Sequence, residues 1–257
     1  MTATARALSF MFFFLLLPLV SASVGSSTQE LTVAAASDLA FPFKEIGPLF
    51  ERARGAKVTF IFGSTGTLAK QIEYGAPVDV FFSADVGFVE SLKQKGKTIP
   101  ESQLLYAQGR IALAVAKRSG LTVTTLEDLL RPEVRRVAIA NPAHAPYGKA
   151  AQEALEAARV WDRVRSKLVY GENIRQALQF VQTGNAEAGI VALSIANVPE
   201  ITYTLIEQTL HKPLNQAAAL VTRSPRPELG LAFIRFVNGP QGRPIMKRYG
   251  FLLPDEF

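Results

Sequence analysis

The sequence of 257 residues contains no cysteine and only two histidines, His144 and His211. The lack of cysteine excludes disulfide bonds, thiolate metal sites and a cysteine nucleophile. It also excludes an export signal of the lipoprotein type, which requires a cysteine. Two histidines leave few candidate residues for a histidine-based zinc site or a Ser–His–Asp triad.

Charged residues are also sparse, at 19% of the chain against 48% apolar residues, which indicates a globular rather than a disordered protein. The 28 basic residues exceed the 22 acidic ones only mildly. They cluster briefly, at Arg135-Arg136 and Lys247-Arg248, without an arginine-rich stripe or interleaved aromatic residues. We therefore do not expect nucleic-acid binding. A modest attraction for anions is the simpler interpretation of the charge.

The N-terminus has the three-part layout of a secretory signal. Arg6 precedes the apolar run "ALSFMFFFLLLPLV", which Pro18 interrupts, and "VSA" ending at Ala22 is a plausible cleavage site. The run is short for a membrane span of about 20 residues, although an uncleaved anchor is the alternative. Removal of a signal peptide at 1–22 leaves 27 basic and 22 acidic residues, a net charge of +5. We expect a soluble protein exported to the periplasm.

From Leu31 onward, strand-like and helix-like segments alternate. Near-continuous apolar runs such as "LTVAAAS", "KVTFIFGS" and "VDVFFSA" are each followed by an amphipathic segment such as "TLAKQIEYG". This alternation predicts an α/β protein whose parallel sheets are covered by helices on both faces.

Four predicted strands run directly into helix starts that are rich in small or polar residues. These starts are Ser37-Asp38, Ser64–Thr67, Pro146–Gly148 and Glu172–Ile174. The first N–H groups of a helix lack partners within the helix and suit an oxyanion, and ligands of open α/β sheets bind at such edges. The alternative is that Ser, Thr and Asn only cap the helices, for ~1 kcal/mol each. "GSTGTLAK" lacks the lysine placement of a nucleotide-binding P-loop.

Several segments together resemble one family. At "AAASDL", "GSTGTLAKQIEYGAPVDVFFSAD", "NPAHAPYG", "ENIRQALQFVQTGNAEAGIVALS" and "GPQGRPIMKRYGF" the sequence resembles the periplasmic molybdate-binding proteins of bacterial ABC importers. The resemblance implies a two-lobed periplasmic-binding-protein fold of type II, each lobe a mostly parallel sheet flanked by helices. Residues 31–111 and 216–257 would form lobe 1 and residues 112–215 lobe 2. The ligand would lie in a cleft that closes by hinge motion.

The same resemblance implies the ligand-binding residues. Ser37 occupies the position of a serine or threonine that binds the oxyanion through its hydroxyl and backbone N–H. Ser64 and Thr65 cover a second hydroxyl position, and Thr65 is the closer match by register. Tyr147 and Ile174 stand where backbone N–H groups are offered, so their side chains are expected to be nearly free to vary. No cofactor is implied, and molybdenum would enter only as an oxyanion without a direct protein ligand.

Two positions depart from the family pattern. Some members use a tyrosine hydroxyl where this sequence has Ala192, so that contact must be absent or supplied elsewhere. Asp38 stands where some relatives have asparagine, and its carboxylate would repel a dianion. We expect Asp38 to contribute only its backbone, with the carboxylate turned away or capping the helix. Outside the implied ligand set, His144 is interpreted as a surface-turn residue, with gating or a pH response as the alternative, and Arg175 as a solvated arginine.

The resulting hypothesis is a monomeric binding protein that captures molybdate or tungstate for a membrane-embedded ABC permease and performs no chemistry. Neutral hydroxyl and N–H donors in a dry cleft prefer a dianion that only accepts hydrogen bonds. One alternative is sulfate, phosphate or a small organic acid, the last usually held by an arginine clamp. The other is a hydrolase with Ser37, Ser64 or Ser83 as nucleophile, although none lies in a G-x-S-x-G motif.

Overall fold

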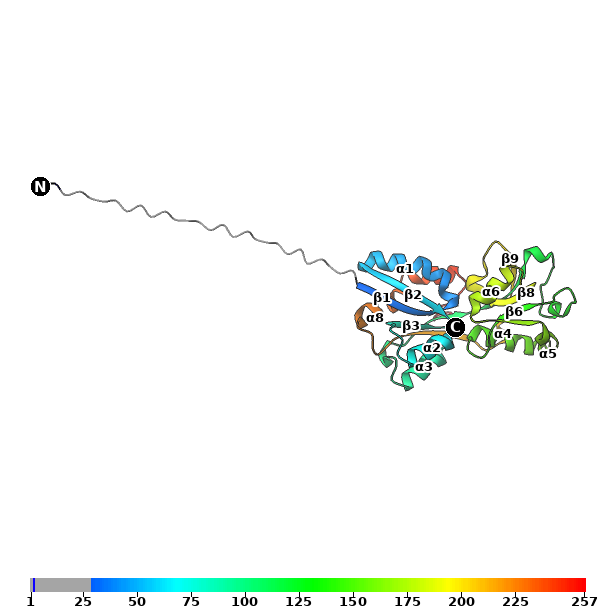
Figure 1. Cartoon of the computed structure of the whole chain (residues 1–257), viewed down its shortest axis with the longest axis horizontal. Coiled ribbons are helices and arrows are strands. Elements are labelled where there is room, and N and C mark those ends of the chain that lie inside the picture. Colours follow the sequence, from blue (N-terminus) through cyan, green and yellow to red (C-terminus); the bar gives the residue numbers. More distant parts are fainter. Residues whose placement is uncertain (1, 3–28) are drawn as a thin grey trace.

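The computed structural model describes Thr2 and residues 29–257, and these fold into two lobes that lie side by side (Figure 1). Each lobe is built on one five-stranded sheet. Apart from Thr2, the predicted signal peptide at 1–22 lies outside the described residues. Within the described part of the chain, none of the helices has the length and apolar character that a membrane span requires.

The first lobe contains both ends of the described chain. Its sheet has the spatial order β2 (Ala56–Gly63), β1 (Gln29–Ala36), β3 (Val80–Ser83), β10 (Leu214–Leu220) and β4 (Leu104–Gly109). Its helices are α1 (Ala40–Arg54), α2 (Thr65–Glu73), α3 (Val86–Gln94), α8 (Pro227–Val237) and α9 (Gly242–Arg248), with 3₁₀ turns η1 (Ser37–Leu39) and η2 (Pro100–Ser102). Strand β1 pairs in parallel with β2 and β3, whereas β10 pairs antiparallel with β3 and β4.

The second lobe repeats this plan. Its sheet has the order β7 (Leu168–Gly171), β6 (Val137–Ala140), β8 (Ala188–Ala192), β5 (Ile111–Ala116) and β9 (Ile201–Leu205). Its helices are α4 (Pro146–Ala157), α5 (Trp161–Val164), α6 (Ile174–Gln182) and α7 (Leu193–Ala196), with 3₁₀ turns η3 (Lys117–Ser119), η4 (Glu127–Leu130), η5 (Arg165–Lys167) and η6 (Gln208–Leu210). Strand β5 runs antiparallel to both of its neighbours.

The two-lobed α/β fold is confirmed, and both sheets are mixed. The strands β10 and β5, which follow the crossings from one lobe to the other, run antiparallel to their neighbours. The chain first crosses at Arg110, between β4 and β5, and returns in residues 206–213. Ile111 therefore lies in the second sheet and Leu214 in the first, one or two residues from the predicted boundaries at 111/112 and 215/216.

Period-2 alternation along the strands separates the core of the first lobe into two layers. Val33 belongs to a buried cluster with Phe43 of α1 and Phe233 of α8, whose rings meet edge to face at 5.6 Å. The next residue, Ala34, belongs to a different cluster with Leu68 of α2. Helices therefore cover both faces of this sheet, as the near-continuous apolar strands predict.

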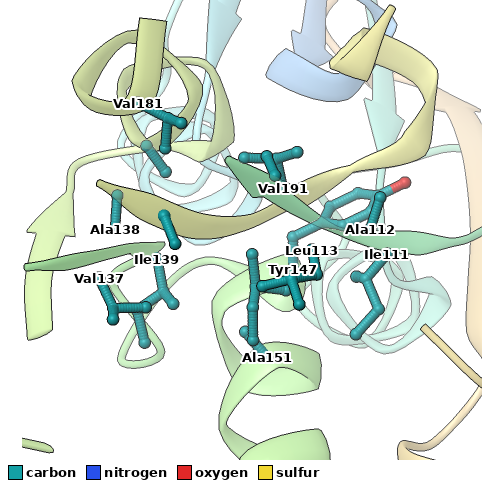
Figure 2. Packing of buried hydrophobic residues seen from close by; sticks show 14 of the residues in the cluster. Ile111, Ala112, Leu113, Val137, Ala138, Ile139, Tyr147, Ala151, Val181 and Val191 are labelled. Carbon is teal, nitrogen blue, oxygen red and sulfur yellow. The ribbon is translucent and has the colours of Figure 1, made fainter. Parts of the chain in front are cut away.

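The second lobe has the same layered packing (Figure 2). Val181 of α6 packs on one face of the sheet, and Tyr147 and Ala151 of α4 pack on the other. The strand residue Ile139 lies between these layers and is fully buried. Packing of this kind holds the N-terminal ends of α4 and α6 in fixed positions at the edge of the sheet.

Candidate functional site

All six predicted ligand residues are buried. Their relative exposures are 3% for Ser37, 0% for Asp38, 4% for Ser64, 1% for Thr65, 2% for Tyr147 and 4% for Ile174. Polar side chains are rarely buried to this extent unless they have hydrogen-bonding partners. The contacts of these residues therefore decide what the site can do.

Within each lobe, two helix starts lie at one edge because the preceding strands are parallel and in register. In the first lobe Ala36 pairs with Gly63, which places Ser37 next to Ser64. The Ser37 hydroxyl donates a hydrogen bond to the carbonyl of Gly63, the residue before Ser64, at 3.0 Å, in agreement with this placement. In the second lobe Ala140 pairs with Gly171, so the turns that lead into α4 and α6 also leave the sheet at one edge.

The two lobes meet where the turn before α4 touches the start of α2. The backbone carbonyl of His144 accepts hydrogen bonds from the Ser64 hydroxyl at 2.8 Å and from the Gly66 N–H at 2.9 Å. The Nδ1 atom of His144 lies 2.7 Å from the same Ser64 oxygen. A Cβ atom built on Gly66 would lie 2.7 Å from the His144 carbonyl oxygen, so only glycine permits this approach.

Glu172, in the turn before α6, adds a second contact between the lobes. One carboxylate oxygen accepts a hydrogen bond from the Thr67 hydroxyl of α2 at 3.1 Å. The other lies 3.6 Å from Nε2 of His144. Ser64, Gly66 and Thr67 of lobe 1 thus contact His144 and Glu172 of lobe 2, and we call these five residues the closure contact.

A buried polar network joins the lobes beneath the site. The Tyr147 hydroxyl donates to Oδ2 of Asp38 at 3.0 Å, and Gln216 donates from Nε2 to the same oxygen at 2.9 Å. The Gln216 amide also donates to the Tyr147 hydroxyl at 2.9 Å, and its carbonyl accepts from the Tyr106 hydroxyl at 2.7 Å. These four residues are at most 2% exposed. Only Tyr147 comes from lobe 2, so its phenol is the cross-lobe member of the network.

Two small residues complete this arrangement. A Cβ atom on Gly109, immediately before the first crossing, would lie 2.2 Å from the Tyr147 hydroxyl and 2.7 Å from Nε2 of Gln216. Glycine at this position therefore makes room for the network. Ser194 of α7 donates its hydroxyl to the backbone carbonyl of Asp38 at 2.8 Å and forms a further bond between the lobes. It stands two residues after Ala192, where the expected tyrosine is missing.

The electrostatics of the network follow from its burial. Loss of solvent raises the pKa of Asp38 from 3.8 to about 6, although hydrogen bonds from Gln216 and Tyr147 oppose the rise. Burial, together with the nearby Asp38 carboxylate, also raises the pKa of Tyr147 and Tyr106 well above that of a free tyrosine. Both phenols therefore remain protonated donors. The Oδ1 atom of Asp38 has no hydrogen-bond partner within the described residues.

The three predicted hydroxyl donors differ in where their single proton goes. Ser37 and Ser64 each lie within donating distance of a backbone carbonyl, Gly63 and His144 respectively. Thr65 instead accepts, at 3.1 Å, a hydrogen bond from the N–H of Ala84, so its own proton is directed elsewhere. Thr65 is therefore the hydroxyl best prepared to donate to an anion, and Ser64 serves the closure contact.

The two predicted backbone donors stand first among the N–H groups of their helices. Proline at 146 has no N–H, so that of Tyr147 is the first that α4 offers, and no side chain caps this helix. In α6 the Asn173 side chain accepts from the N–H groups of Arg175 and Gln176 and leaves that of Ile174 to other partners. Among the helix starts in the four predicted stretches, side-chain capping occurs only in α6.

A pocket of about 430 Å³ opens between the lobes beside the site. Ser37, Phe41 and Phe62 line it from lobe 1. Its lobe 2 wall consists of Asn173, Arg175, Gln176, Leu178, Gln179 and Gln182. The pocket lies between η1 and the start of α6. It completes a ring in which each of the four predicted stretches neighbours two of the others. Within residues 29–257 no group of three or more His, Asp or Glu residues could hold a metal ion.

The structure changes two expectations drawn from sequence and decides between two alternatives for a third residue. The side chain of Tyr147 is not nearly free to vary, because its hydroxyl bonds two residues across the cleft. His144 is a closure residue rather than an ordinary surface-turn residue. For Asp38 the first of the two expected alternatives holds, because its carboxylate turns to the buried network and does not cap a helix through a side-chain hydrogen bond. Sequence reasoning missed Gln216, which lies inside strand β10, and Ser194, whose helix start after β8 was not among the four predicted ones.

The chain belongs to the bacterial extracellular solute-binding protein family, whose model matches residues 31–252. Members of this family are binding proteins rather than enzymes. Two relatives, from Azotobacter vinelandii and Rhodobacter capsulatus, are each named molybdate-binding protein ModA. The first is 36% identical over 230 residues, covering 88% of this chain and 91% of the relative. The second is 34% identical over 228 residues, covering 88% and 90%.

The fold agrees with this relationship. The solved structure of the periplasmic molybdate-binding protein of Azotobacter vinelandii superposes with a TM-score of 0.82 at 28% identity. The match covers 87% of this chain and 99% of that one. The similarity therefore spans both lobes and the cleft between them.

Proposed function

We propose that this protein captures molybdate, and tungstate with it, in the periplasm and delivers it to a membrane-embedded ABC import permease. It acts as a monomer, without a cofactor and without chemistry on its ligand. The observation that carries the proposal is the ring of four helix starts, two from each lobe, around one cleft. The names of the two relatives support the choice of ligand.

Four groups would hold the oxyanion. From lobe 1 the Thr65 hydroxyl would donate, as would the Ser37 hydroxyl once its proton turns from the Gly63 carbonyl to the anion, and the backbone N–H groups of Tyr147 and Ile174 would donate from lobe 2. The helix starts supply positive potential without a charged side chain. Because donors come from both lobes, the bound anion would favour the closed cleft, in which the closure contact also forms.

Selectivity would follow from geometry and protonation. Fixed donors favour a dianion that only accepts hydrogen bonds, so a protonated phosphate would place a donor against donors. Sulfate is smaller than molybdate and would leave longer hydrogen bonds in a cleft of fixed size. Tungstate is nearly the same size as molybdate and would bind similarly.

Calorimetric titration of the purified protein with molybdate, tungstate, sulfate and phosphate tests this proposal. We expect strong binding of the first two and weak binding of the others. Sulfate binding as tight as molybdate binding would overturn the assignment in favour of the alternative oxyanion function. The remaining alternative ligand is a small organic acid. It would be indicated if an organic acid bound in the same titration while none of the four inorganic anions did.

One observation would favour the hydrolase alternative. Ser64, His144 and Glu172 follow one another at 2.7 Å and 3.6 Å, in the order of a catalytic triad. However, Ser64 is 4% exposed, and its hydroxyl also lies 2.8 Å from the His144 carbonyl. The three residues come from two lobes and form the closure contact, so we interpret them as a latch. Absence of turnover of generic ester and phosphate substrates is the expected result.

A further inference from the structure

Arg175 has a position that its neighbours do not explain. It is the second residue of α6, its side chain is exposed, and it lines the pocket that reaches Ser37. Its backbone N–H is bound by Asn173, so the helix cap does not require the guanidinium. Within residues 29–257 the guanidinium forms no salt bridge or hydrogen bond.

The other residues around this pocket are uncharged. Three amides, from Gln176, Gln179 and Gln182, follow one side of α6, and Phe41 and Phe62 form part of the opposite wall. The nearby Glu172 carboxylate is engaged by Thr67 and His144 and does not line the pocket. Among the described residues that line the pocket, Arg175 alone carries a charge, which gives the opening of the cleft a positive potential.

A second pocket, of about 500 Å³, shares Phe41 but differs in two respects. It does not include Ser37, and each of its cations has a partner. Arg110 donates to the Gly250 carbonyl at 2.8 Å, whereas Lys247 and Arg248 pair with glutamates. An incoming anion would compete with these partners there, but not at Arg175.

We propose that the Arg175 pocket is an encounter site, where a hydrated oxyanion dianion first binds before it loses water and moves to the donors around Ser37 and Thr65. A volume of about 430 Å³ holds on the order of ten waters at about 30 Å³ each, far more than a bare tetrahedral anion needs. The exposed amides of Gln176 and Gln179 can bond the hydration shell, whereas the amide of Gln182 already donates to Glu200 at 3.0 Å. The guanidinium attracts the charge without enclosing it. This inference rests on the proposed function for its choice of probe.

If the pocket is an encounter site, substitution of Arg175 should change the association rate constant more than the dissociation rate constant. The dissociation rate of molybdate is measured by exchanging radioactive for unlabelled molybdate, and the dissociation constant by calorimetry; their ratio gives the association rate. We expect Arg175→Gln to lower the association rate roughly three- to ten-fold at low ionic strength, with the dissociation rate changed less than about two-fold. The difference should fall below about two-fold at 0.5 M salt, because screening removes steering.

Arg163→Gln is the matched control, because Arg163 is an exposed arginine on α5 of the same lobe and its substitution removes the same charge. It should leave both rates unchanged within about two-fold. If Arg175→Gln raises only the dissociation rate, Arg175 belongs to the closed site and the proposal is overturned. Equal rates in both variants also overturn it and identify an ordinary surface arginine. Failure of the proposed function itself would appear separately, as absence of molybdate binding by the unmodified protein.

Discussion

Replacement of Gly66 by alanine should weaken ligand binding while it stabilises the ligand-free protein. Gly66 is the second residue of α2 and has no requirement for a positive φ angle, so alanine fits the helix itself. In the closed arrangement, however, the added Cβ would lie 2.7 Å from the carbonyl oxygen and 3.0 Å from the Cβ of His144 in the other lobe. Atoms this close must move apart, and the simplest movement separates the lobes.

The magnitudes follow from the contacts that would be lost. The His144 carbonyl accepts two cross-lobe hydrogen bonds, from Ser64 and Gly66, each contributing about 0.5–1.5 kcal/mol net. Their combined loss of about 1–3 kcal/mol corresponds to a five- to hundred-fold weaker affinity. In the open, ligand-free protein the same substitution should stabilise α2 by about 0.5–1 kcal/mol, because glycine is a poor helix former.

Affinity by calorimetry and unfolding by urea without ligand measure the two effects separately. Gly87→Ala is a matched control, since Gly87 is likewise the second residue of its helix, α3, and its nearest neighbour is Asp85 of the same lobe. The control should keep its affinity, and because its Cβ would lie 3.2 Å from the Asp85 carboxylate that caps α3, we expect little or no gain in stability. If Gly66→Ala binds molybdate within two-fold of the parent protein, the contact between α2 and His144 is not part of the bound state, and the account of closure is wrong.

Four further predictions concern the donors, the network and export. Tyr147→Phe removes the cross-lobe hydroxyl that bonds the buried Asp38 carboxylate. A hydrogen bond to a charged group contributes about 1.5–3 kcal/mol, so molybdate binding measured by calorimetry should weaken about ten- to a hundred-fold. A change below three-fold would contradict the network's role. Thr65→Val removes a hydroxyl whose proton is not used in its bond with Ala84, and it should cost a similar factor. Ser64→Ala should mainly speed dissociation in exchange measurements, and equal dissociation rates would refute the division of roles. Because burial raises the pKa of Asp38 from 3.8 to about 6 in the folded protein, the folded state holds the Asp38 proton more tightly than the unfolded chain does, and the free energy of unfolding in urea without ligand should fall as pH rises from about 4 to 6. Asp38→Asn should abolish this dependence in the same titrations, and a retained pH profile would assign it to another group. Mass spectrometry of exported protein should find a mature chain that begins near Ser23, and retention of the apolar run would refute the signal assignment.

The elements that present the ligand groups could be predicted from the sequence because their signals are local. A buried strand followed by Ser37, or by Ser64 and Thr65, is visible in a window of about ten residues. The choice of Thr65 over Ser64 followed from the register of the family motif, and the contact of Thr65 with Ala84 gives a physical reason for it.

The contacts that close the cleft could not be predicted in this way. Gln216 and Asp38 are 178 positions apart, and Ser64 and His144 are 80 apart. No periodicity or capping rule relates residues at such separations. The role of Gly109 was equally hidden, since its lack of a side chain matters only because the Tyr147 hydroxyl of the other lobe occupies that space.

The most direct test of the central claim is anomalous diffraction from crystals grown with molybdate, which locates the molybdenum atom without reference to the protein. The account predicts one strong peak within the cleft, with its oxygens in hydrogen-bonding distance of the Ser37 and Thr65 hydroxyls and of the Tyr147 and Ile174 N–H groups. A peak that lies only beside Arg175, or molybdenum ligated directly by a carboxylate or an imidazole, would contradict it.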